Sequence, residues 1–242
     1  MGQSAAGPDP VLAMRDVEKQ YGGLRPLRIR HLVLPARSSA MLLGFDRPAA
    51  ETFINLITGS TLPDAGEIAS LGRSTREITN SAEWLGFVEQ FGIVSDRVAL
   101  LDGMTVAQNL AISFDLDLDP VPPHILEQVA RLAAEAGITG SMLDMRVADT
   151  DSLLRARIRL ARALAFDPVL LVLEHPTAAL SPEQAGSYAS IIRNVRGGRK
   201  ATLVGLTADE KFAEQTSSRL LVWQPATGEF RERSSRKFWP FS

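Results

Sequence analysis

The chain has 242 residues, no cysteine, 45% apolar and 22% charged residues, and a formal net charge of -2. This length suits one domain, or one core with an inserted subdomain, and allows a sizeable buried core. The composition excludes collagen-like, disulfide-stapled and disordered proteins, and the lack of cysteine excludes thiol catalysis and cysteine-ligated metals. The near-neutral charge gives no reason to expect a nucleic-acid partner. No apolar run approaches the length of a membrane span, so we expect a soluble globular protein.

The first half of the chain is predicted to begin with strands and to continue with helices. Residues 1–10 are small and polar and predict a flexible tail. The expected elements are strands over 11–17, 29–34 and 40–43, a helix over 51–57, a turn over 61–67 with a strand ending at Ile68, a strand over 85–88, and helices over 105–110 and 123–136. Residues 91–150 are therefore interpreted as an inserted helical subdomain.

The second half alternates between helices and strands. The pattern predicts helices over 153–166 and 181–195, a turn over 196–200, and strands over 169–173, 201–206 and 219–224. Such alternation is typical of an α/β domain with a parallel sheet. We expect one domain over 11–230, followed by a basic and aromatic tail over 231–242.

The tail carries four cations before a short aromatic segment, Phe238-Trp239-Pro240-Phe241. The cations are Arg231, Arg233, Arg236 and Lys237. Two interpretations are equally supported: contact with a membrane surface or a partner, and solvated charges on a tail that packs on its own domain.

Four segments in a fixed order carry a resemblance to a known family. They are LARALAFDPVLLVLEHPTAALSPEQ (160–184), the stretch from Leu42 to Ile68 that contains NLITGSTLPDAGEI, GFVEQ (86–90), and Tyr21-Gly22-Gly23. Over residues 11–230 the chain resembles the nucleotide-binding subunit of ABC (ATP-binding cassette) transporters. The resemblance implies an α/β, P-loop NTPase-like core, with a parallel sheet and flanking helices, an N-terminal antiparallel β part and an inserted helical subdomain.

The segment that the resemblance aligns with the P-loop has lost the residues that bind phosphate. A P-loop uses glycines to turn backbone N–H groups onto phosphate, a lysine for charge and a Ser or Thr for Mg²⁺. Here the segment reads GFDRPAAET from Gly44, with Ala50 at the lysine position and Glu51 at the Mg²⁺-binding position. The vestigial nucleotide site is assigned to Tyr21, Gly44, Arg47, Ala50, Glu51, Thr52 and Gln90. We interpret the segment as a strand–turn–helix connector; the alternative keeps Arg47 as a substitute phosphate ligand.

The other motifs depart from the family as well. Glu174 stands where the family has its Mg²⁺-coordinating Asp, and His175 where it has the catalytic Glu. Ala208 stands at the H-loop position. The signature motif is replaced around Asp151, Ser152 and Leu153, and Leu153 and Leu154 are expected to face a partner's nucleotide.

These losses favour a degenerate cassette. The resemblance implies a transmembrane permease as partner, docked in a groove around residues 91–125, a homodimer or a heterodimer with another cassette, and a place at the inner face of the cell membrane. The leading hypothesis is a non-hydrolysing structural or regulatory subunit for which ATP and Mg²⁺ are doubtful cofactors. A second is a working ATPase with Arg47, Glu174 and His175 as unusual ligands, and a third is an interaction module unrelated to transport. His31, His124 and His175 show no metal-ligand spacing, so no metal site is predicted.

Overall fold

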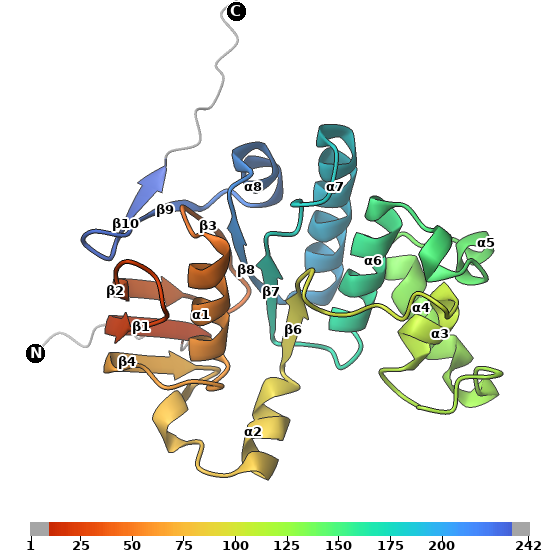
Figure 1. Ribbon diagram of the computed structural model, residues 1–242, viewed down its shortest axis with the longest axis horizontal. Coiled ribbons are helices and arrows are strands. Elements are labelled where there is room, and N and C mark those ends of the chain that lie inside the picture. Colours follow the sequence, from red (N-terminus) through yellow and green to blue (C-terminus); the bar gives the residue numbers. More distant parts are fainter. Residues whose placement is uncertain (1–9, 234–242) are drawn as a thin grey trace, which may run out of the picture.

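The computed structural model describes residues 10–233, so nearly all of the expected N-terminal tail and residues 234–242 lie outside it. Two sheets and a group of helices make up this part of the chain (Figure 1). The main sheet has the strand order β10-β9-β3-β8-β7-β6, and all its neighbours are parallel except β10, which runs antiparallel to β9. Its strands are β3 (Ser39–Leu43), β6 (Phe91–Val94), β7 (Leu170–Glu174), β8 (Thr202–Thr207), β9 (Leu220–Gln224) and β10 (Glu229–Arg233).

The centre of the main sheet is buried on both faces. Every residue of β3, β7 and β8 is buried, as expected for the continuous apolar runs SAMLL, LLVLE and TLVGLT in a parallel sheet covered on both sides. Because these strands are parallel, their carboxyl ends meet at one edge of the sheet. This edge is where residues from separate parts of the chain come together.

A second, antiparallel sheet lies beside the main one, with helix α1 between the two (Figure 1). Its strand order is β2-β1-β4-β5. Apolar residues of β1, β2, α1, β7 and β8 form one continuous core cluster. The elements are β1 (Leu12–Lys19), β2 (Leu27–Leu34), α1 (Arg47–Ile57), β4 (Ala65–Ser70), β5 (Arg73–Ser74) and the short 3-10 helix η1 (Thr75–Glu77).

The remaining helices, except α2 (Ser81–Val88), share a second apolar core with β3, β7 and β8. The one buried residue of α2, Phe87, belongs to the first core. The others are α3 (Val106–Ala111), η2 (Pro123–Ile125), α4 (Leu126–Glu135), α5 (Gly140–Leu143), η3 (Val147–Asp149), α6 (Ser152–Ala163), α7 (Pro182–Arg199) and α8 (Glu210–Thr216). Within residues 10–233, none of the helices is both long and apolar enough to cross a membrane.

The predicted α/β class is confirmed, with its parallel sheet, its N-terminal antiparallel part and its inserted helices. One predicted element is wrong: residues 85–88 end helix α2 instead of forming a strand. The helix begins because Asn80 caps it, accepting a hydrogen bond from the backbone N–H of Glu83 at 2.9 Å. A four-residue apolar run cannot by itself distinguish a strand from the last turn of a helix.

Several boundaries also differ from the expectation. Helix α1 begins at Arg47, four residues before the expected start, and α7 continues through the expected turn to Arg199 before Lys200 ends it in a left-handed conformation (φ 56°). Strand β6 belongs to the main sheet, so the helical part follows it instead of starting at residue 91. Residues 231–233 of the expected tail belong to β10, where Arg233 forms an ion pair with Glu210.

Candidate functional site

The carboxyl ends of the parallel strands bring four predicted residues to one edge. Gly44 follows β3, Glu174 ends β7, His175 comes next, and Ala208 follows β8. The N-terminus of α1 starts from the same edge, directly after Gly44. In open α/β sheets, ligands bind outside the carboxyl ends of the strands, so this edge is the candidate site.

The N-terminus of α1 is closed by its own cap. The carboxylate of Asp46 accepts a hydrogen bond from the backbone N–H of Ala49 at 2.8 Å, and the Asp46 carbonyl accepts one from the N–H of Ala50 at 2.9 Å. Pro48 has no N–H to donate. Because α1 already begins at Arg47, the segment aligned with a phosphate-binding loop is the first turn of a helix. The N–H groups of Ala49 and Ala50 are therefore engaged within the chain.

The side chains near the start of α1 are either buried in the core or bonded to other groups of the protein. Ala50, which the resemblance aligns with the family's lysine, is fully buried in the core. The hydroxyl of Thr52 donates to the carbonyl of Pro48 at 2.8 Å, inside its own helix. The guanidinium of Arg47 lies 2.9 Å from the carboxylate of Asp96, which follows β6.

Arg97 joins Glu51 and Glu174, the two acidic residues that the resemblance aligns with the family's Mg²⁺-binding residues. Its Nη1 donates to Glu51 Oε1 at 2.7 Å, while its Nε and Nη2 donate to Glu174 Oε2 at 3.1 and 2.8 Å. The side chain of Glu174 is only 5% exposed, whereas that of Arg97 is 41% exposed. A buried carboxylate needs a counter-ion, and Arg97 supplies it. The sequence analysis missed Arg97 because no local pattern marks it.

His175 lies next to this network without a clear partner. Its backbone has a left-handed conformation (φ 42°), and its N–H donates to the carbonyl of Leu206 at 2.8 Å. The ring atom Nε2 is buried and makes no hydrogen bond in the described part of the chain. The structure thus shows no group that would orient this imidazole as a base.

Tyr21 lies near the same helix end but folds onto its own loop. A Cβ atom at Gly23 would stand 2.7 Å from Cζ of the Tyr21 ring, so the ring covers that glycine. Burial, together with the negative charge of Asp46, raises the pKa of the Tyr21 hydroxyl. Gly44 is required by geometry: its φ is 94°, and a Cβ atom there would lie 3.1 Å from the carbonyl oxygen of Trp223.

Gln90 lies at the opposite edge of the sheet. Its carbonyl accepts hydrogen bonds from the N–H groups of Val169 and Leu170, at the amino ends of β6 and β7. Gln90 lies there because residues 81–88 form a helix and the strand comes later, at Phe91–Val94. The residues that follow the carboxyl end of this strand are Ser95, Asp96 and Arg97. Gln90 therefore does not join the other site residues.

The residues at the signature position begin helix α6. Asp151 caps this helix, accepting a hydrogen bond from the N–H of Leu154 at 2.7 Å, and Ser152 and Leu153 form its first turn. The expectation that both leucines face a partner's nucleotide is wrong for Leu154, which is buried in the core, while Leu153 is half-buried. The 3.6-residue period of α6 turns Leu154 inward.

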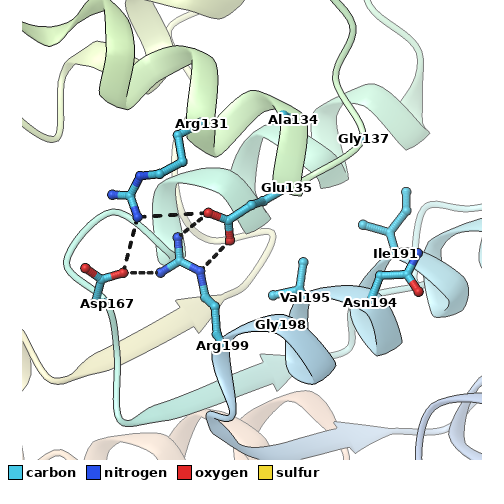
Figure 2. A pocket seen from close by; sticks show the side chains of 10 residues that line it. All are labelled: Arg131, Ala134, Glu135, Gly137, Asp167, Ile191, Asn194, Val195, Gly198 and Arg199. Carbon is cyan, nitrogen blue, oxygen red and sulfur yellow. Dashed lines mark hydrogen bonds and ion pairs between the residues drawn. The ribbon is translucent and has the colours of Figure 1, made fainter.

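A separate cavity of about 480 Å³ lies between α4 and α7 (Figure 2). Its charged residues satisfy one another: Arg199 bonds Glu135 from two nitrogens and Asp167 from a third, and Arg131 lies 3.5 Å from Asp167. Figure 2 shows these four side chains turned toward one another across the mouth of the cavity. Arg131 and Arg199 thus already have carboxylate partners, and none of the residues singled out from the sequence lines this cavity.

The chain matches no protein-family model. It is 29% identical over 212 residues to the sulfate/thiosulfate import ATP-binding protein CysA of Thermosynechococcus vestitus, an alignment that covers 87% of this chain and 60% of that protein. The chain thus spans about 60% of the length of such curated relatives.

Solved structures agree with this similarity. The structure of cbiO1 from Clostridium perfringens, part of the ABC transporter complex cbiONQ, superposes with a TM-score of 0.77 at 19% identity, covering 92% of this chain and 87% of that one. A dimeric ATP-binding cassette, MJ0796, bound to ADP and Pi superposes with a TM-score of 0.71 at 18% identity, covering 94% of this chain and 100% of that one. The chain has the fold of an ATP-binding cassette and is similar in sequence to proteins that contain one.

Proposed function

We propose that this cassette is a subunit of an ABC transporter-type complex that works with a transmembrane permease without hydrolysing ATP. The observation that carries the proposal is the closed N-terminus of α1, where Asp46 takes the N–H groups of Ala49 and Ala50. A phosphate placed there would meet a carboxylate instead of free donors, with no lysine to offset its charge. The residues present do not fit a bound triphosphate.

The arrangement of Arg97 supports the same proposal for Mg²⁺. A divalent cation bound by Glu51 and Glu174 would have to displace the guanidinium that bonds both carboxylates. A Mg²⁺ site in such proteins needs substrate phosphates as further ligands, and the closed α1 terminus disfavours those. The two departures therefore reinforce each other.

The permease and the cassette partner are inferred from relatives. The curated relative is named an import ATP-binding protein. Of the two similar structures, cbiO1 is part of a transporter complex and MJ0796 is a dimer. We place this chain at the inner face of the cell membrane on that basis, in a homodimer or paired with another cassette. Because the P-loop and the signature positions both depart from the family, the chain would weaken each composite nucleotide site that it joins.

Thermal unfolding with added ATP tests the proposal. A ligand that binds the folded state at 100 times its Kd stabilises it by about 2.7 kcal/mol, which moves Tm by several degrees. We expect no saturable change in Tm with ATP, with or without Mg²⁺. A saturable, Mg²⁺-dependent rise would contradict the closed nucleotide site on which the proposal rests.

Phosphate release distinguishes the alternative of a working ATPase with Arg47, Glu174 and His175 as ligands. Steady release that disappears in His175→Ala would favour that alternative. Arg47 and Glu174 are both engaged in ion pairs, so we expect no release, either from the chain alone or with its partner present. Co-purification without a membrane protein would instead favour an interaction module unrelated to transport.

A further inference from the structure

The cavity between α4 and α7 lies away from the carboxyl edge of the main sheet (Figure 2). Two residues of its lining show where it lies: Asp167 shortly precedes β7, and Arg199 shortly precedes β8. The cavity is therefore near the amino ends of these strands, whereas the candidate nucleotide site is at their carboxyl ends. Its volume of about 480 Å³ falls within the range of small-molecule sites.

The charged side chains that line the cavity sum to zero charge. Arg131 and Arg199 provide two cations, and Glu135 and Asp167 provide two anions. A ligand with only a negative or only a positive group would meet like charges there as well as opposite ones. A ligand with one group of each sign fits this lining better, because both of its groups find an opposite charge.

Arg199 fixes the two carboxylates and leaves other groups of the cavity available. Its Nε and Nη2 donate to Glu135 at 2.5 and 2.9 Å, and its Nη1 donates to Oδ1 of Asp167 at 2.6 Å. Arg131 lies 4.0 Å from Glu135 and 3.5 Å from Asp167, and its guanidinium makes no hydrogen bond within residues 10–233. Over the same residues, Oδ2 of Asp167 accepts none. Because the carboxylate is already held, little ordering would be lost when a ligand bonds it.

The other end of the cavity is mainly apolar. Ile191 and Val195 lie one turn apart on α7, and Ala134 of α4 also lines the cavity. Asn194 adds an amide that makes no hydrogen bond in the part of the chain that the structure describes. Figure 2 shows Ile191 and Asn194 at the end away from the charged group. This end suits a short aliphatic side chain.

Gly198 keeps the cavity open. It lies in the last turn of α7, where a Cβ atom would meet no other heavy atom within 4 Å. Glycine in a helix is less favourable than alanine, and neither packing nor a positive φ requires it here. What this residue provides is open space beside the charged group. Gly197 is equally unconstrained but does not line the cavity, so it offers a matched comparison.

We propose that this cavity binds a free α-amino acid with an aliphatic side chain. The carboxylate of the ligand bonds the guanidinium of Arg131, its ammonium group donates to Oδ2 of Asp167, and its side chain lies against Ile191 and Val195. The two charged groups of an amino acid are joined through one carbon atom, which suits a cation and an anion that lie 3.5 Å apart. Charge-assisted hydrogen bonds of this kind are among the stronger ones in proteins.

The site goes beyond the proposed function and requires no nucleotide. Because the cavity joins α4 of the inserted helices to α7, a bound amino acid would restrain the position of one helix relative to the other. Binding at this site and binding of ATP can therefore be measured separately.

Ligand-observed NMR on the full chain, with L-valine, L-leucine and L-isoleucine as probes, tests the proposal. We expect saturable binding with a Kd below about 10 mM, the range for such small ligands. Two analogues of L-leucine separate its charges: isocaproate lacks the ammonium group, and isoamylamine lacks the carboxylate. Each should bind at least about tenfold more weakly than L-leucine, since each loses one charge-assisted hydrogen bond.

Three variants locate the binding. Gly198→Leu should fill the cavity and abolish binding, whereas Gly197→Leu, on the same helix but outside the cavity, should bind as the original chain does. Leucine favours a helix more than glycine does, so both variants should fold. Arg131→Gln should weaken L-leucine at least about tenfold and should not weaken isoamylamine, which has no carboxylate for Arg131 to bond.

Several outcomes would overturn the proposal. They are that none of the three amino acids binds, that Gly198→Leu binds them as well as Gly197→Leu does, or that either analogue binds as tightly as L-leucine. Equal affinity of L-leucine for Arg131→Gln and for the original chain would overturn it as well.

Discussion

Arg97 holds the buried carboxylate of Glu174 through two hydrogen bonds, from Nε at 3.1 Å and from Nη2 at 2.8 Å. The two residues come from different parts of the main sheet, since Arg97 follows β6 and Glu174 ends β7. Their contact places the guanidinium of Arg97 where the resemblance to the family predicts a metal ion. The stability of this edge should therefore depend on the pair.

Replacing Arg97 by Ala should destabilise the fold by about 1–2 kcal/mol, because Glu174 would stay buried without a counter-ion. The estimate lies below that for a fully buried pair because Arg97 is itself 41% exposed. Unfolding in urea measures the change. Adding Glu174→Gln should recover part of the loss, and a purely additive double variant would show that the two residues do not interact.

Asp46→Ala should cost about 1 kcal/mol through the loss of the α1 cap. Asp46→Asn, which keeps an oxygen for the N–H of Ala49, should stay close to the original stability. Urea unfolding of both variants gives the comparison. Equal stability of the alanine variant and the original chain would show that the cap is not needed for α1.

Arg199→Ala should destabilise the contact of α4 with α7 by about 2–3 kcal/mol (Figure 2). Its side chain is 12% exposed, and it bonds Glu135, Asp167 and the carbonyl of Leu164. Arg131→Ala is the matched control: that side chain is 46% exposed, so its loss should cost less than about 1 kcal/mol. Similar losses in the two variants, measured by chemical denaturation, would contradict this difference.

Asp64 should contribute to the pH dependence of stability in acid. Hydrogen bonds from the backbone N–H of Gln20 and from the Lys19 ammonium lower the pKa of its carboxyl below the ordinary value. A lowered pKa in the folded state stabilises the protein above the unfolded value of about 3.9, and this stabilisation is lost as the pH falls through the folded value.

The variant Asp64→Asn should therefore show a shallower loss of stability below about pH 4 than the original chain. Unfolding curves recorded across this range measure the slope. Asp144→Asn, at an exposed carboxylate without an ion pair in residues 10–233, is the control. An unchanged acid slope in Asp64→Asn would contradict the assignment.

Local sequence patterns predicted most of the elements, because apolar periodicity and helix caps depend on residues that are close together along the chain. The continuous apolar run VLLVL predicts a buried strand, and Ser181-Pro182 marks the start of α7, where Ser181 caps the helix. The strand predicted at 85–88 is wrong because the short run LGFV fits a helix as well as a strand. As a result, Gln90 was expected at the carboxyl edge of the sheet, whereas it lies at the amino edge. The correct placement depends on the pairing of β6 with β7, which no short segment encodes.

The sequence by itself determined the α/β class and the order of most of the elements. It also singled out Glu51 and Glu174, which the resemblance aligns with the family's metal-binding residues. Only the tertiary structure decided what compensates them, since Arg97 lies 46 residues from Glu51 and 77 from Glu174 along the chain. Burial and apolar periodicity are local properties that a sequence displays, whereas the partner of a charge is decided by which strand ends meet in space.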